Sequence, residues 1–185
     1  MTSNRSVGID LRALRKNRGL TVTEMSALIG RSIGFISQIE RGLSQPSIND
    51  LRKIAAVFGV PISFFFSESA AHPSEARHIV RRDDRRSLGT PAGGVVDQLL
   101  SPDLGGSFET LLSEFAPHSE LVDAVQRGTE EAGYVISGTL EIEISGVWHE
   151  LRQGDSFRFV GEPYRWRNRT DAPAILVWVI APPVY

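Results

Sequence analysis

The chain has 185 residues, of which 41% are hydrophobic and none is cysteine, and its formal net charge is -2. This length suits one large domain or two small ones, and the hydrophobic content is ordinary for a globular protein with a packed core. The lack of cysteine excludes disulfides, thiolate metal sites and cysteine nucleophiles. No apolar run approaches the roughly 18 residues of a spanning helix, and the N-terminus shows no signal-peptide pattern. We therefore expect a cytoplasmic protein with no membrane partner.

The charge is divided unevenly along the chain. Residues 1–66 hold nine Lys and Arg against four Asp and Glu, a net charge of +5, whereas residues 67–185 hold eleven against eighteen, a net charge of -7. A basic segment suits a polyanion, which an acidic segment would repel. The two parts of the chain are therefore expected to meet different partners.

Residues 9–66 show helical periodicity with clear start and stop signals. Capping boxes at Thr21/Glu24 and Ser47/Asp50 predict the starts of a second and a fourth helix, and Ser32 caps a third. A first helix precedes Gly19, and a short fifth helix is expected over residues 62–66. The apolar faces expected to pack are Ile9, Leu11 and Leu14 in the first helix, Met25, Leu28 and Ile29 in the second, Ile36 and Ile39 in the third, and Leu51, Ile54, Ala55 and Phe58 in the fourth.

Five short helices with a turn of three or four residues between the second and third predict an all-α helix-turn-helix domain. Periodicity alone leaves a plain helical bundle as an alternative. The string ISQIERGLSQPSINDLRKIAAVFGVP resembles the core of the phage-repressor-type (Xre/Cro family) DNA-binding domain, and the resemblance runs without a gap from about Ile9 to Phe66. It implies that residues 1–66 bind double-stranded DNA.

The resemblance also implies roles for single residues. The start of the third helix would enter the major groove, with base-reading positions at Ile33, Gly34, Ser37 and Gln38. Phosphate contacts would come from Thr21, Val22, Arg41, Ser44 and Gln45, although Val22 departs from the polar residue usual at its position. Arg15 and Glu40 match an ion pair that ties the first helix to the third. Ile33 has a second interpretation, because it lies three residues before Ile36 and would complete the core.

A boundary is expected after the helical region. Residues 67–76 are small, polar and proline-containing, which predicts a linker. The run RRDDRR at residues 81–86 pairs its own charges, so we interpret it as a solvated strand end rather than a second DNA-contacting patch. His72 and His78 beside it lack metal-ligand spacing.

From Val95 onward the hydrophobic period changes to two. Eight strands are expected, over residues 95–100, 108–115, 134–136, 140–144, 147–151, 156–160, 164–168 and 174–180. Their regular spacing predicts an antiparallel sandwich or barrel. The tryptophans at 148, 166 and 178 are expected to serve in packing.

The segments TEEAGYVISGTLEIEI, GDSFRFV and PYRWRN resemble the two motifs of the cupin barrel, a double-stranded β-helix. The resemblance implies a cupin domain over residues 77–185 and a two-domain α + β protein. A helix-turn-helix domain fused to one cupin barrel is a layout of bacterial transcriptional regulators that sense small metabolites.

The metal ligands of the cupin motifs are replaced in this sequence. A metal-binding cupin uses three His and one Glu. The Glu position is Glu131, but the three His positions hold Val125, Arg127 and Tyr164, and neither His118 nor His149 fits the motif. We therefore expect no metal, no cofactor and no catalytic residue, which disfavours the alternative of a metal-dependent cupin oxidase or epoxidase.

The same four positions predict an effector pocket. Arg127, Glu131 and Tyr164, with Val125, are expected to face the barrel interior and to hold a small zwitterion or carboxylate. Arg127 would bind its acid group and Glu131 an amine or hydroxyl. In the alternative, Arg127 and Glu131 pair with each other and the barrel is a ligand-free dimerisation module. The leading hypothesis is a homodimeric, metabolite-sensing regulator on an inverted-repeat operator.

Overall fold

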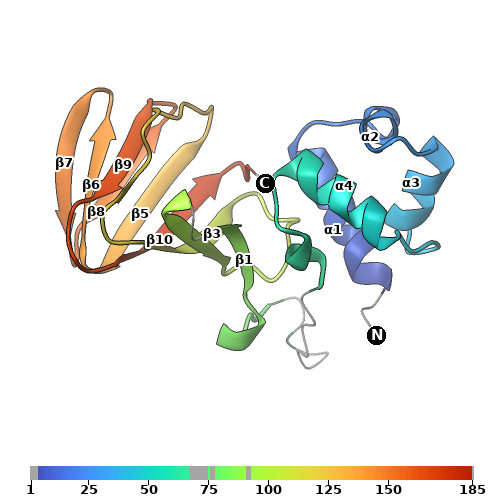
Figure 1. Ribbon diagram of the computed structural model, residues 1–185, viewed down its shortest axis with the longest axis horizontal. Coiled ribbons are helices and arrows are strands. Elements are labelled where there is room, and N and C mark those ends of the chain that lie inside the picture. The colour runs from blue at the N-terminus through green and yellow to red at the C-terminus, as the bar shows by residue number, and fades with distance from the viewer. Residues whose placement is uncertain (1–3, 67–74, 76–77, 91–92, 185) are drawn as a thin grey trace. The chain divides into compact units, whose positions relative to one another are not determined.

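The computed structural model describes residues 4–66, 75, 78–90 and 93–184 (Figure 1). Contacts divide the chain into two compact units. The helical unit comprises residues 1–86, 102–106 and 184–185, and the β unit comprises residues 87–101 and 107–183. Most of the predicted linker, residues 67–74 and 76, lies outside the described residues. None of the described helices is long and apolar enough to cross a membrane.

The helical unit contains four α-helices. They are α1 (Asn4–Asn17), α2 (Val22–Ile29), α3 (Ile33–Glu40) and α4 (Ile48–Phe58). Both predicted capping boxes are present, since the N-cap hydroxyl and the acidic side chain three residues later satisfy each other's backbone N–H groups. The predicted fifth helix is instead a 3₁₀ segment, η1 (Ile62–Phe66), opened by a hydrogen bond from Phe64 N to Pro61 O. Five residues after a proline give little room for α-helical bonds.

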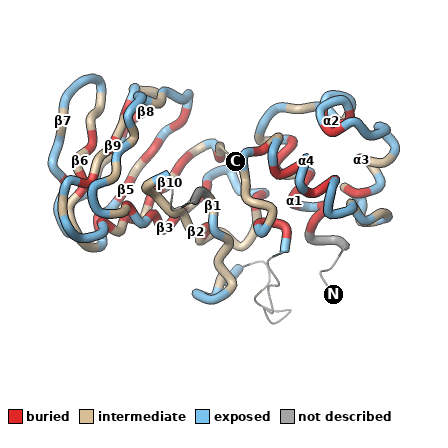
Figure 2. Tube along the Cα trace, viewed as in Figure 1, coloured by how far each residue is buried: buried red, intermediate tan, exposed pale blue. Residues whose placement is uncertain are grey.

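The core of the helical unit is made by the apolar faces of these helices. Leu11, Leu14, Met25, Ile29, Ile36, Ile39, Ile54 and Phe58 are all buried, and Figure 2 marks the buried stretches on α1 and α4. Two expectations were wrong, because Ile9 and Leu28 are about half exposed. In α1 the buried face runs through Val7, Leu11 and Leu14 at helical spacing, which turns Ile9 outward.

Helix α1 approaches α3 very closely at Gly8. A Cβ atom at this position would lie 2.1 Å from the backbone oxygen of Ile39, a distance that no real Cβ atom tolerates. Glycine is therefore required here for packing rather than for backbone conformation. The absence of a side chain allows the two helix backbones to meet.

The N-terminus of α4 is joined to the end of α2 through Asp50. The buried Asp50 carboxylate accepts hydrogen bonds from Arg31 Nε at 2.7 Å and from Ser47 N at 3.1 Å. These bonds, the one with Arg31 first, lower the Asp50 pKa to about 2. Lys53 Nζ donates to Ile29 O at 3.1 Å and so satisfies a carbonyl at the end of α2.

The β unit consists of two antiparallel sheets. Its strands are β1 (Arg86–Thr90), β2 (Val95–Leu99), β3 (Glu109–Phe115), β4 (Ser119–Glu120), β5 (Glu130–Ser137), β6 (Thr139–Ile144), β7 (Val147–Arg152), β8 (Ser156–Val160), β9 (Tyr164–Asn168) and β10 (Ala174–Ala181). One sheet has the order β1-β2-β3-β10-β5-β8 and the other β4-β9-β6-β7. The predicted strands are present, and β5 begins four residues earlier than expected, so that Glu131 lies in a strand.

Aromatic rings join the inner faces of the two sheets. Phe115 of β3 contacts Trp166 of β9 with ring centroids 4.7 Å apart, and Tyr164 of β9 lies 5.7 Å from Trp178 of β10. Gly133 of β5 admits the ring of Phe157, since a Cβ atom there would lie 2.4 Å from that ring. Trp166 and Trp178 are buried, as predicted, and the core of the β unit lies between the sheets.

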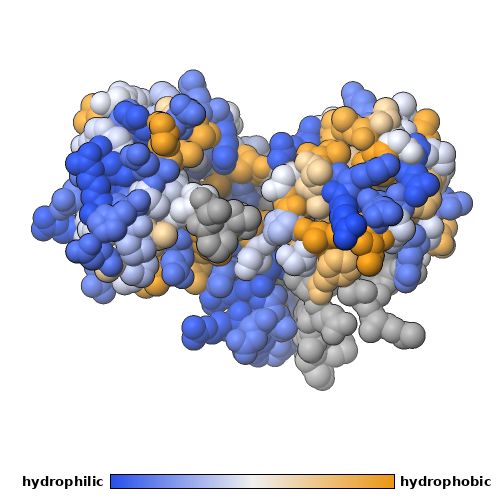
Figure 3. All heavy atoms as spheres, viewed as in Figure 1, coloured by the Kyte–Doolittle hydropathy of each residue, from blue (hydrophilic) through white to orange (hydrophobic). Residues whose placement is uncertain are grey.

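The outer face of the four-stranded sheet is covered by ion pairs. Glu141 pairs with Arg167 and Glu143 with Arg165, and both guanidinium groups lie over the half-buried ring of Trp148. Figure 3 shows a largely hydrophilic surface where β6 and β7 lie in Figure 1. Such exposed or half-exposed pairs contribute little to stability individually, and here they keep the sheet face polar.

The prediction that residues 81–86 form a solvated strand end whose charges pair with one another was wrong. Residues 82–84 form a 3₁₀ turn, η2 (Arg82–Asp84), and Arg81 pairs with Glu75 outside the run. Arg86 is not a solvated strand end, because its side chain is 17% exposed and pairs with Asp10 of α1. A partner 76 positions away cannot be inferred from local charge pattern.

Replacing Asp50 with Asn is expected to lower the free energy of unfolding by about 2 kcal/mol at pH 7. The reason is that the Asp50 pKa is lower in the folded chain than the ordinary value of 3.8. This stability is fully present above the ordinary pKa and is lost as the pH falls through about 2. Urea denaturation at pH 7 and at pH 3 would show a smaller difference between Asp50→Asn and wild type at the lower pH. The exposed control Asp83→Asn should leave stability nearly unchanged, and an equal loss in both variants would contradict the assignment.

Candidate functional site

Helices α2 and α3 form a helix-turn-helix. Gly30 ends α2 with φ +66, a left-handed conformation that favours glycine. Ser32 then begins α3, and its hydroxyl accepts a hydrogen bond from Phe35 N at 3.1 Å. The intervening turn is only three residues long, so α3 leaves α2 at a sharp angle set by these two residues.

The four predicted base-reading residues lie at the start of α3 and on its outer side. Ile33, Gly34 and Gln38 are exposed and Ser37 is half-buried, whereas Ile36 and Ile39 point into the core. Ile33 is 50% exposed and so does not complete the core. This arrangement offers an apolar group and an amide to a base edge, the groups that suit a thymine methyl and an adenine.

Among the described residues, no neighbour requires glycine at position 34. A Cβ atom there would meet only Ser32 Oγ at 4.0 Å, which is ordinary contact. Glycine in a helix costs about 0.5–1 kcal/mol relative to alanine. Gly8 is thus needed for packing, whereas Gly34 leaves its backbone bare on the exposed side of α3.

The predicted phosphate-contacting residues differ in how free they are. The Thr21 hydroxyl is engaged with Glu24 in the α2 cap, and Val22 is half-buried. Arg41 is exposed, although its Nε donates to Ser37 O at 3.1 Å, and Gln45 is exposed beside the half-buried Ser44. Arg41 and Gln45 are therefore the members of this set most available to a phosphate.

The ion pair between Arg15 and Glu40 is present. Arg15 donates from Nε at 2.6 Å and from NH2 at 2.9 Å to the two carboxylate oxygens of Glu40. Both side chains are mostly buried, and the hydrogen bond with Glu40 raises the Arg15 pKa. Arg15 also donates to Leu20 O, so one side chain ties α3 to α1 and to the loop before α2.

In the β unit, Glu131 is the most tightly held of the predicted pocket residues. It is 1% exposed, and its carboxylate accepts hydrogen bonds from Thr129 Oγ1 and from Trp178 Nε1, each at 2.8 Å. Its charge also acts on the neighbouring Tyr164. Two donors from the chain itself hold this carboxylate in place, as a buried acid requires.

Tyr164 lies against the same carboxylate and between aromatic rings. Its ring is 4.9 Å from that of Phe159, and burial, followed by the negative charge of Glu131, raises the Tyr164 pKa. The hydroxyl therefore stays protonated near neutral pH. Val125 is half-buried and exchanges two backbone hydrogen bonds with Tyr164, each 2.8 Å long.

Arg127 differs from its expected position. Its side chain is exposed rather than enclosed, and no ion pair to Glu131 exists among the described residues. Its positive charge nevertheless acts on both Tyr164 and Asp97, where it offsets part of the rise in pKa that burial causes. The expected interior position of Arg127 and the alternative of an Arg127–Glu131 pair are both corrected by this placement.

Asp97 belongs to the same cluster and was missed from the sequence. It stands on β2 opposite Ser113 of β3, and burial raises its pKa. The signal was present, because Asp97 is two residues before the buried Leu99 and so shares its side of the strand. We refer to Asp97, Arg127, Glu131 and Tyr164 as the inner cluster.

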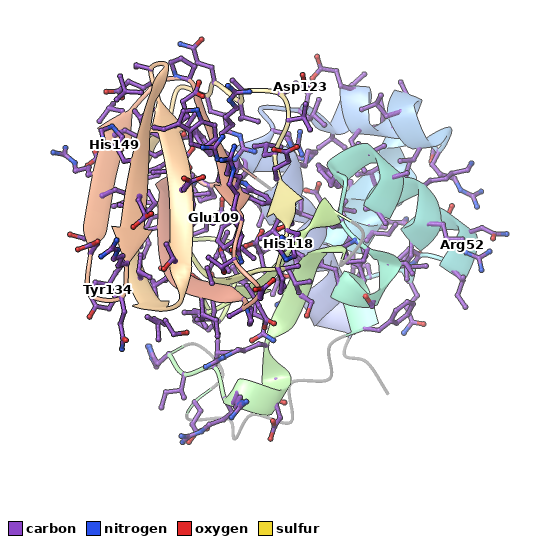
Figure 4. All side chains as sticks on the ribbon, turned by 60° about the vertical axis from the view of Figure 1, so that its left-hand side comes forward. Arg52, Glu109, His118, Asp123, Tyr134 and His149 are labelled. Carbon is purple, nitrogen blue, oxygen red and sulfur yellow. The ribbon has the colours of Figure 1, made fainter. Side chains whose placement is uncertain are left out.

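The residues at the cupin metal positions do not fit a metal ion. Val125, Arg127 and Tyr164 replace imidazoles, and Glu131 already accepts hydrogen bonds from Thr129 and Trp178. His118 and His149 lie well apart in Figure 4, and His118 pairs with Asp171. In the described part of the chain, no three His, Asp or Glu side chains are grouped to hold a metal ion.

Comparison with known proteins agrees with this architecture. Residues 11–65 match the helix-turn-helix family HTH_3, and residues 111–180 match the cupin domain family Cupin_2. The chain is 27% identical to the HTH-type transcriptional regulator PuuR of Escherichia coli over 163 residues, 87% of this chain and 86% of that protein. It is 28% identical to the HTH-type transcriptional regulator SutR of the same organism over 166 residues, 85% of this chain and 84% of that protein.

Among solved structures, FeII HppE shares the fold. The TM-score is 0.50 at 16% identity, covering 97% of this chain and 100% of that one. At this identity the similarity describes the fold alone and carries no activity over to this chain.

Replacing Gly34 with Ala is expected to separate stability from DNA binding. The variant should be more stable by about 0.5–1 kcal/mol, because alanine favours the helix and meets no neighbour. Its affinity for the duplex that wild-type protein selects from a random-sequence library should fall, because the added methyl group stands on the DNA-reading side. Thermal unfolding and fluorescence anisotropy would measure the two effects. Gly128→Ala in the β unit is the matched control, and unchanged affinity of Gly34→Ala would contradict the assignment.

Proposed function

The chain belongs to the Xre/Cro-type helix-turn-helix transcriptional regulators with a C-terminal cupin domain, and we propose that its β unit senses a small organic zwitterion or carboxylate without a metal. The protein is a DNA-binding transcriptional regulator. The observation that carries the proposal is the inner cluster. The positive charge of Arg127 acts on Asp97, yet no ion pair joins these two side chains among the described residues.

The charges of the inner cluster suit the two ends of a zwitterion. The exposed guanidinium of Arg127 would bind an acid group, and the half-buried Asp97 would accept a hydrogen bond from an amine. Glu131 already accepts hydrogen bonds from Thr129 and Trp178. The amine-binding role expected for Glu131 is therefore better assigned to Asp97, with Glu131 holding Tyr164 in position.

We further propose that the protein acts as a homodimer on an inverted repeat. One short reading helix contacts only a few base pairs, and two copies related by a two-fold axis would place two such helices in successive major grooves about 10 base pairs apart. A ligand would alter operator affinity only by binding the DNA-competent and incompetent arrangements with different affinity.

A thermal-shift screen of amino acids, amines and small organic acids tests the sensing proposal. A ligand at 100 times its dissociation constant stabilises the folded state by about 2.7 kcal/mol, which raises the melting temperature by several degrees. The shift should be lost in Asp97→Asn and in Arg127→Gln but kept in Arg152→Gln, whose side chain is exposed and pairs with Glu150. A screen without any stabilising compound would instead favour a ligand-free dimerisation module.

Footprinting of the duplex selected from a random library tests the dimer. We expect two protected half-sites with related, inverted sequences whose centres lie about one helical turn apart. Gln38→Ala should weaken binding by about 1–3 kcal/mol and relax the base preference at one position in each half-site. A single protected half-site without symmetry would rule out the proposed arrangement.

A further inference from the structure

The turn between α2 and α3 contains an arginine whose position is set within the helical unit (Figure 1). Arg31 lies between Gly30, which ends α2, and Ser32, which begins α3. Its backbone N–H donates to Ser26 O at 3.0 Å, so the turn is held against the end of α2. Arg31 therefore stands directly before the helix whose first residues are proposed to read bases.

The guanidinium group of Arg31 is held by one edge. Its Nε donates to Asp50 Oδ1 at 2.7 Å and its NH2 donates to Asp50 Oδ2 at 3.2 Å, which is the two-bond geometry of a guanidinium facing a carboxylate. The Asp50 side chain is 3% exposed, and it also accepts hydrogen bonds from the backbone N and the hydroxyl of Ser47. The carboxylate is thus a buried support that orients the arginine from the inner side.

The outer edge of the same guanidinium group has donors left over. A guanidinium carries five N–H donors, and the contact with Asp50 uses two of them. The Arg31 side chain is 46% exposed, and among the described residues its NH1 has no hydrogen-bond acceptor. Such an edge can donate parallel hydrogen bonds to a phosphate while the inner edge keeps the carboxylate.

Arg31 lies at the flank of α3. Its guanidinium carbon is 5.2 Å from the centre of the Phe35 ring, and around the helix Phe35 lies between the exposed Gln38 and the buried Ile39. A major groove about 12 Å wide is nearly filled by a helix of about 10–12 Å, so side chains at the flank of the helix meet the sugar-phosphate backbone. A cation at this place suits a phosphate rather than a base edge.

We propose that Arg31 binds a DNA phosphate through the outer edge of its guanidinium group, with Asp50 and Phe35 as its positioning residues. The contact rests on the proposed placement of α3 in the major groove. Asp50 then has two roles, because it caps α4 and also sets the direction of a cation beside the reading helix. DNA meets the half-exposed cation and not the buried carboxylate.

The salt dependence of DNA binding tests this contact, because each phosphate contact releases counterions. Fluorescence anisotropy would follow the full chain on the duplex that wild-type protein selects from a random-sequence library, at about 50 to 200 mM salt. In Arg31→Gln the affinity should fall roughly tenfold, and the slope of log affinity against log salt should decrease in size by about 1. The base preference should not change, since a phosphate contact carries no sequence information.

The matched control is Arg152→Gln in the β unit. Arg152 is an exposed arginine paired with Glu150, so this change removes the same charge and also breaks an ion pair. The control variant should keep the wild-type affinity and the wild-type salt slope.

Two further variants separate a phosphate contact from a purely structural role of the ion pair. Asp50→Asn breaks the same pair but keeps the cation, so its salt slope should equal that of wild type. Arg31→Gln combined with Asp50→Asn leaves no buried carboxylate without its partner, so this chain should fold even where Arg31→Gln alone does not, and it should show the lowered slope. A wild-type slope in the double variant, or an equal loss of slope in Asp50→Asn, would overturn the proposal.

The same titrations keep this contact apart from the proposed base reading. A changed base preference in Gln38→Ala together with a wild-type slope in the double variant would overturn only the contact of Arg31. A lowered slope in the double variant with no effect of Gln38→Ala would support the contact and remove Gln38 from the base-reading residues. Wild-type protein that selects no duplex would overturn both.

Discussion

The close docking of α1 on α3 is the constraint on which the proposed reading of DNA by α3 depends. An eight-residue helix has no stability of its own in water, so its position must come from its neighbours. Gly8 lets the two backbones meet, and the ion pair from Arg15 to Glu40 fixes the end of α3 in the buried region. With Ile36 and Ile39 held inward, the opposite side of α3 is left exposed, as the proposed contact with bases requires.

In the β unit, too, positions are fixed by contacts between neighbours, and the central one is the buried carboxylate of Glu131. Glu131 keeps the position of a cupin metal ligand, but it accepts hydrogen bonds from a hydroxyl and an indole of the chain itself. A buried anion with this many donors rigidifies its surroundings and needs no ion. Loss of the metal ligands and retention of Glu131 are therefore compatible, because the residue now orders Tyr164 and Trp178.

How much the sequence predicts depends on how far apart the interacting residues are. Capping boxes and strand alternation are local, and the helices, the antiparallel sheets and the buried tryptophans at 166 and 178 were predicted from them. The alternation along β2 also places Asp97 on the same side as the buried Leu99, but Asp97 was not predicted as a site residue. Asp10 lies 76 positions from its partner Arg86, and Trp178 lies 47 positions from Glu131. The period of the hydrophobic residues cannot predict contacts between residues so far apart in the sequence.

Local and long-range interactions have different roles in this protein. Local signals build the reading helix and the strands, whereas long-range polar contacts decide what each element is tied to. A ligand changes DNA affinity only if the two sites bias one shared element with alternative arrangements. Helix α1 illustrates the role of long-range contacts, because Arg15 in α1 holds the end of α3 through Glu40. The position of the proposed reading helix therefore depends on a helix that supplies none of the proposed base contacts.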